Sequence, residues 1–216
     1  MVPSSVNDIQ PSGRVLNILS STAPLILVVP SITSSPTLSA ALQIAHDLDT
    51  YHKLDSEIID GSEALKRLET GKLGHGNLVL FGSGDNSFMT YLLEREGTPF
   101  RLTHGKLYLN GITVQGDTTS LFLHPHPTSP SSLSLIIHYN TEEAMERGLR
   151  LFPIRTGVTV PDWVITSGEA DKKGAGGVVG AGYVFFLSPQ GRITYLCSPS
   201  SVWGNGWSWN EAMSSF

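Results

Sequence analysis

Hydrophobic residues in the first hundred positions form short continuous runs that alternate with stretches of helical spacing. The runs at residues 25–29, 58–59 and 77–81 are typical of buried strands, and each is followed by apolar positions spaced three or four apart. Ser35 and Pro36 form a helix-start signal after the first run. A strand–helix order repeated three times predicts right-handed crossovers and a parallel sheet.

The second half of the chain has shorter elements and more turn signals. Residues 100–115 alternate between apolar and polar, with Gly105 and Asn110-Gly111 as hairpin turns. Strands are expected at 120–123, 133–139 and 163–165, and a helix is expected from Thr141. We therefore predict one α/β domain built on a three-layer open sheet. Its shape would be Rossmann-like or flavodoxin-like, mostly parallel, with an antiparallel portion in the second half.

Composition narrows the classes of partner. The net charge of −5, with no stripe of Lys and Arg, argues against nucleic acid. The single cysteine, Cys197, excludes an internal disulfide and a zinc site built on cysteines. The longest apolar run, residues 23–30, is far too short to span a membrane, and no secretory signal is visible at the N-terminus. We expect a soluble protein whose location the residues leave unknown.

The polar loop at residues 82–86 is the best-placed candidate site. In open α/β sheets, ligands bind beyond the carboxyl ends of the strands, so Ser83, Asp85 and Asn86 are candidate ligand-binding residues. The structural alternative is that the glycines permit a tight turn while Asp85 or Asn86 caps the next helix.

Other motifs predict no cofactor, no metal and no catalytic residue. The glycines of residues 177–182 have the wrong order for a dinucleotide fingerprint, and close backbone packing explains them. Gly-x-Ser-x-Gly, the nucleophile elbow of α/β-hydrolases, does not occur. His124 and His126 could begin a zinc site with a third ligand from His104, His138 or Asp117. The alternative is a turn stiffened by proline that carries exposed histidines.

Several segments together resemble a known family. They span most of the chain in order, at residues 23–30, 41–45, 77–82, 148–153, 156–163, 169–177 and 207–213. On these the chain resembles the C-terminal α/β domain that follows a prolyl-oligopeptidase-like α/β-hydrolase module in large fungal proteins and bacterial relatives. The resemblance implies a hydrolase module as partner and an extracellular setting, and it assigns no catalytic residue.

The chain departs from the family pattern near its C-terminus. The pattern runs from the Gly-rich segment almost directly into an aromatic-Trp-Gly-Asn ending, represented here by Trp203-Gly204-Asn205, whereas residues 184–202 intervene in this chain. They are either an intron retained in frame or a surface hairpin, and the mature transcript would distinguish the two. The expected organisation is a linker or severed join at 1–22, an α/β domain at 23–183, the insertion at 184–202, and a docking tail at 203–216.

Three functions remain open from the sequence. The first is a non-catalytic accessory domain of a secreted serine-hydrolase polypeptide, which could also bind a peptide or carbohydrate. The second is a small free-standing hydrolase that uses Ser83, Asp85 and Asn86 with His124 or His138. The third is a flavodoxin-like module that binds a ligand at the same edge without chemistry.

Overall fold

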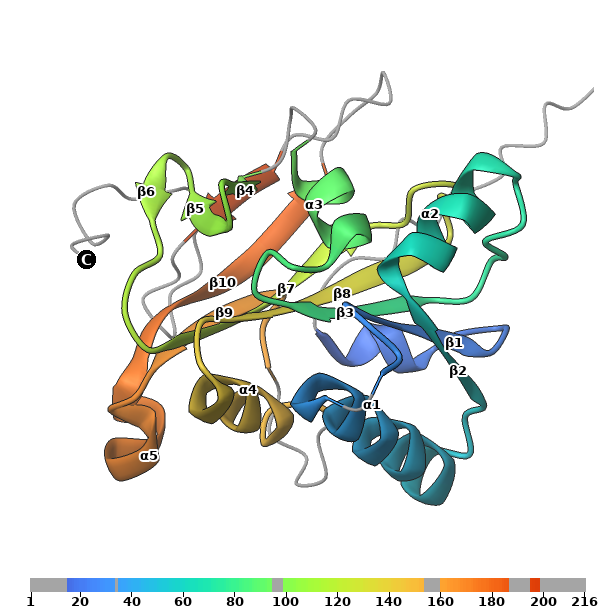
Figure 1. The fold of residues 1–216 in the computed structure, drawn as a ribbon. Coiled ribbons are helices and arrows are strands. Elements are labelled where there is room, and N and C mark those ends of the chain that lie inside the picture. The colour runs from blue at the N-terminus through green and yellow to red at the C-terminus, as the bar shows by residue number, and fades with distance from the viewer. Residues whose placement is uncertain (1–14, 34, 95–98, 154–159, 187–194, 199–216) are drawn as a thin grey trace, which may run out of the picture.

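A central sheet separates two layers of helices (Figure 1). The computed structural model describes residues 15–33, 35–94, 99–153, 160–186 and 195–198. Helices α1 (Pro36–Asp47) and α4 (Glu142–Leu149) cover one face, and α2 (Gly61–Glu69) and α3 (Ser87–Leu93) cover the other. This arrangement confirms the predicted α/β class and its three layers.

The described part of the main sheet has eight strands in the order β11-β10-β9-β7-β8-β3-β1-β2. β7 and β10 run opposite to the other strands. The bounds in chain order are β1 (Leu25–Val29), β2 (Ser56–Asp60), β3 (Leu78–Gly82), β7 (Thr118–Pro125), β8 (Leu133–Tyr139), β9 (Trp163–Ser167), β10 (Val178–Phe186) and β11 (Tyr195–Ser198).

The parallel half forms where continuous apolar runs meet capped helices. Every residue of β1 and β3 is buried, as expected for strands covered on both faces. The Ser35 hydroxyl accepts from the Leu38 N–H to begin α1, and the Asp60 carboxylate accepts from the Glu63 N–H to begin α2. Each cap fixes the point at which the chain turns from a strand edge into its crossover helix.

A hairpin changes the direction of the sheet in its second half. β8 pairs parallel with β3 on one side and antiparallel with β7 on the other, so it lies where the two halves meet. β9 and β10 extend the antiparallel half, and residues 183–186 of β10 pair with β11. This pairing includes part of the predicted insertion, and the connecting residues 187–194 lie outside the described ones.

A second, smaller sheet lies over the antiparallel half on the α3 side (Figure 1). Its strands are β4 (Phe100–Thr103), β5 (Lys106–Leu109) and β6 (Ile112–Thr113). The predicted turns are present: Asn110 and Gly111 both have positive φ, as a type I′ hairpin requires, and Gly105 turns β4 into β5. Phe100 stacks on Phe122 of β7 with ring centroids 3.9 Å apart, which joins the small sheet to the main one.

The core extends into the N-terminal segment. A 3₁₀ helix, η1 (Val15–Leu19), buries Val15 and Ile18 against the α1 side of the sheet. The Asn77 side chain donates to the Ile18 carbonyl and accepts from the Leu133 N–H, so it connects η1 to β8. The core thus includes residues of the predicted linker at 1–22. Residues 1–14 and the predicted tail at 203–216 lie outside the described part.

The remaining helical segments lie at the periphery of the fold. A π-helical turn, η2 (Leu48–His52), continues α1, and α5 (Ala170–Lys173) with η3 (Gly174–Gly177) connects β9 to β10. The glycine-rich segment does pack closely, as predicted: a Cβ on Gly177 would lie 2.0 Å from the backbone nitrogen of Ala170. In the ranges described, no helix has both the length and the apolar character needed to cross a bilayer.

Candidate functional site

The predicted loop lies at the carboxyl end of β3, beside the carboxyl ends of β1 and β8. Asn86, fully buried, is its central residue. Its amide donates to the carbonyls of Val28 and Phe81, at 3.1 and 2.8 Å, and its oxygen accepts from the N–H groups of Phe88 and Met89. Both amide hydrogens and the oxygen are therefore engaged in holding β1, β3 and the start of α3 together.

Ser83 and Asp85 form a tight turn in front of Asn86. The Asp85 carboxylate accepts from the Ser83 N–H at 2.9 Å, an arrangement in which an aspartate closes its own loop. Gly84, with φ of +102°, packs against Gly105 so closely that a Cβ would lie 2.7 Å from the Gly105 Cα. The loop is thereby fixed against the β4–β5 turn. A ligand-binding role for Ser83 and Asp85 stays a prediction.

A buried polar row lies beneath this loop. His138 of β8 is paired with Gly82 of β3 on one side and with Ser120 of β7 on the other, and both polar side chains are fully buried. Because Gly82 lacks a side chain, the Asp85 carboxylate approaches to 3.0 Å from where its Cβ would be. His138 and Ser120 thus form the buried row on β8 and β7, and the exposed Asp85 lies beside its β3 end, in the loop after Gly82.

This row and Asp85 together have the residue types of a catalytic triad without its hydrogen bonds. Within the described residues, neither ring nitrogen of His138 nor the Ser120 hydroxyl has a hydrogen-bond partner. Burial lowers the pKa of His138 to about 4, against a smaller opposite effect of the Asp85 charge, so the ring is neutral at pH 7. His138 was one of the residues considered from sequence, whereas Ser120 was missed because only the β7–β8 register places it opposite His138.

The histidine pair at residues 124 and 126 is buried, which corrects the expectation of an exposed turn. His124 lies inside β7, which extends to Pro125, and its Nδ1 lies 2.8 Å from the Pro125 carbonyl oxygen. The His126 Nδ1 accepts from the N–H groups of Thr128 and Ser129 and so organises the turn into β8. Among the residues placed by the structure, no three or more His, Cys, Asp or Glu side chains gather as a metal site.

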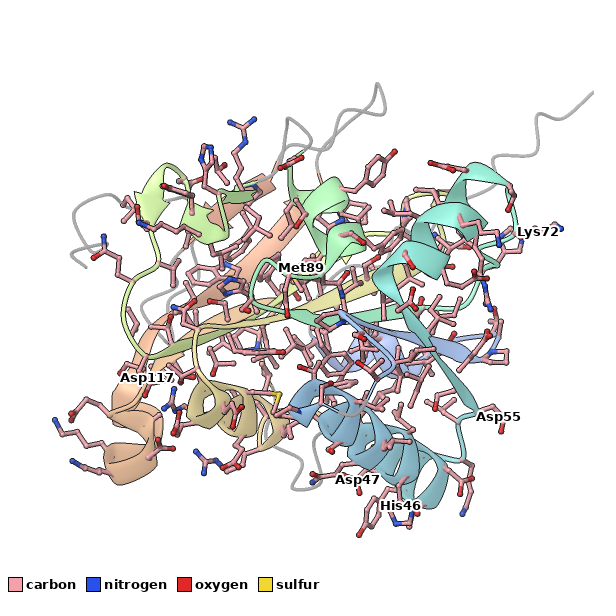
Figure 2. All side chains as sticks on the ribbon, in the orientation of Figure 1. His46, Asp47, Asp55, Lys72, Met89 and Asp117 are labelled. Atoms are coloured by element: carbon pink, nitrogen blue, oxygen red, sulfur yellow. The ribbon has the colours of Figure 1, made fainter. Side chains whose placement is uncertain are left out.

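An ion cluster lies farther along the carboxyl edge of the sheet, where α4, the start of β7 and α5 meet. The buried Arg147 of α4 donates to Asp117 at 2.7 Å and to Asp171 of α5 at 3.0 Å, and Arg150 also pairs with Asp171. Hydrogen bonding to Arg147 lowers the pKa of both carboxyls. Figure 2 shows Asp117 beside α5, far along the sheet from Met89 on α3. The cluster fixes α5 against α4, and its charges are mutually compensated.

Comparison with family models, with curated proteins and with solved structures finds no match to this chain. The site must therefore be interpreted from its own geometry.

The first prediction concerns Asn86. Asn86→Ala should lower the free energy of unfolding by about 3 kcal/mol, because a helix cap is lost and buried carbonyls lose their donors. Asn86→Ser keeps a cap acceptor without the two donors and should lose an intermediate amount. Urea denaturation measures both, with the exposed Ser87→Ala as the matched control, expected within about 0.5 kcal/mol of wild type. A serine variant as stable as wild type would contradict the role assigned to the carbonyl bonds.

The second prediction concerns pH. The pKa of His138 is about 4 in the folded state, below its ordinary value of 6.5, so the unfolded chain binds more protons between these values. Stability should therefore fall as pH drops from about 6.5 to about 4, with His138 contributing at most about 1.4 kcal/mol per pH unit. His138→Leu should reduce this slope and should be no less stable than wild type at pH 7.

The pH dependence of stability that remains in His138→Leu supplies an internal control for this measurement. His126 also has a pKa lowered to about 4 by burial, so the His138→Leu variant should keep part of the pH dependence. Denaturation curves collected at intervals between pH 4 and pH 7 give both slopes. Identical slopes for wild type and variant would show that the His138 ring is not buried as a neutral group.

Proposed function

We propose that this chain is a non-catalytic accessory domain that associates with a serine-hydrolase module. The observation that carries the proposal is that polar side chains at the carboxyl edge of the parallel strands are hydrogen-bonded to the protein backbone. This edge is where α/β proteins place ligands and reacting groups. Here Asn86 is fully engaged with backbone atoms, and Asp85 closes the turn at Ser83.

The partner class comes from the resemblance to domains that follow prolyl-oligopeptidase-like modules. The active site of such a hydrolase module would need no nucleophile from this chain. The accessory domain could pack on the module and limit access to its active site.

A free-standing hydrolase is the second candidate, because Asp85, in the loop after β3, lies beside His138 of β8, which is paired with Ser120 of β7. Two features weigh against it. The Ser120 hydroxyl is buried and makes no hydrogen bond to His138, and the Asp85 oxygen nearest Gly82 accepts from the Ser83 N–H instead. General-base activation of a serine requires the hydroxyl and the imidazole to meet.

A fluorophosphonate probe, which reacts with activated serines, separates the two candidates. The full chain should remain unlabelled, and its Ser83→Ala and Ser120→Ala variants should behave the same way. The immobilised chain, incubated with an extract of the cells that make it, should retain a protein that the probe labels. An immobilised, heat-unfolded chain is the control and should retain none.

Either of two outcomes would overturn the accessory proposal. One is labelling of the chain itself that disappears in Ser120→Ala, which would identify a hydrolase. The other is failure of the folded chain to retain any labelled protein.

A further inference from the structure

A cavity of about 350 Å³ lies between the small sheet and the antiparallel half of the main sheet. Its volume falls at the lower end of the range for small-molecule sites. It is separate from the buried row, since neither Ser120 nor His138 lines it. The lining comes from the small sheet with the segment after it and from β7, β9 and β10 of the main sheet. It includes Leu109, Val114, Thr118, Ile165, Ser167 and Val179, with Thr113 and Gln115 as further polar residues.

The walls of the cavity are mostly apolar, and apolar side chains at its mouth are exposed to water. Leu109 and Ile165 are buried and form the interior wall, whereas Ile112 and Val179 at the margin are 42% and 45% exposed. Burial of such exposed surface by a ligand is favourable in proportion to the apolar area covered. Among the residues that the structure describes, no charged side chain lines the cavity, so an ionic ligand would lose its hydration without compensation.

The neighbouring hydroxyls of Thr118 and Ser167 give the cavity one polar end. Thr118 of β7 is paired with Ser167 of β9, so the two side chains lie on the same face of neighbouring strands. The Thr118 oxygen accepts from the Asn140 amide at 3.0 Å, which leaves the Thr118 proton available to donate. The Ser167 hydroxyl donates to the Gly177 carbonyl at 3.2 Å, which leaves its oxygen available to accept.

A strand irregularity shapes the remaining wall. Val178 pairs with Thr166 and Gly180 pairs with Ile165, so Val179 is an extra residue in β10. Such β-bulges re-aim a side chain and occur often beside functional sites. Here the bulged Val179 contributes to the cavity lining.

We propose that this cavity binds a small uncharged molecule with an aromatic or alicyclic body and one hydroxyl or carbonyl group. The body contacts Leu109, Val114, Ile165 and Val179. The polar group meets the Thr118 hydroxyl as donor and the Ser167 hydroxyl as acceptor. This binding is independent of the association with a hydrolase module.

The test uses 2-naphthol and naphthalene as probes, which differ by one hydroxyl. Saturation-transfer NMR on the full chain should show saturable binding of both, with 2-naphthol the tighter ligand. Thr118→Val keeps the shape and removes the donor, so 2-naphthol should bind about fivefold more weakly while naphthalene is unaffected. Asn140 retains the Gly116 carbonyl as an acceptor in this variant, so the fold should persist.

A second pair of variants tests the location. Val179→Trp places a larger side chain at the half-exposed mouth and should weaken both probes at least tenfold. Leu42→Trp adds the same surface at a 55% exposed position on α1, across the sheet, and should leave binding unchanged. Absence of saturable binding to wild type would overturn the proposal. Unchanged binding in Val179→Trp would also overturn it. So would a loss of binding in Leu42→Trp as large as the loss in Val179→Trp.

Discussion

The hydrogen bonding of Asn86 is the constraint on which the carboxyl edge depends. One side chain donates to carbonyls at the ends of two neighbouring strands and accepts from the first N–H groups of α3. Buried backbone groups that lack partners cost free energy, so this amide allows β1 and β3 to end inside the protein. In the same loop, Asp85 closes the turn at Ser83, and Gly84 packs against Gly105 of the β4–β5 turn.

The parallel half could be predicted because its signals are local. A continuous apolar run, a capping residue and helical spacing occur together within about 25 residues for each unit, as at β1, Ser35 and α1. The turn at Asn110-Gly111 was predictable for the same reason, since a type I′ turn requires positive φ at both positions. The capping alternative for residues 82–86 was also visible in the sequence, and Asn86 does cap α3.

The rest depends on contacts between distant segments. No local sequence signal indicates that β8 pairs with β3, or that β7, which comes earlier in the chain, lies on the far side of β8. The pairing of Ser120 with His138 follows only from this register. Four of the five residues at 15–19 are apolar, but the run is short, and the hydrogen bond that joins it to the sheet comes from the Asn77 side chain, 59 residues from Ile18. The cavity near Val179 requires both a bulge and a separate sheet, neither of which periodicity reveals.

The buried row and the ion cluster, both at the carboxyl edge of the parallel strands, offset the desolvation of their polar groups in different ways. The buried row keeps His138 neutral, since burial opposes its protonation more strongly than the Asp85 charge favours it. The ion cluster instead compensates Arg147 with two carboxylates that remain partly exposed. The cavity differs from both, because its described lining combines apolar side chains with hydroxyls and the Gln115 amide and carries no charge. An uncharged polar group would therefore meet hydrogen-bond partners in the cavity without the desolvation cost that an ion would carry.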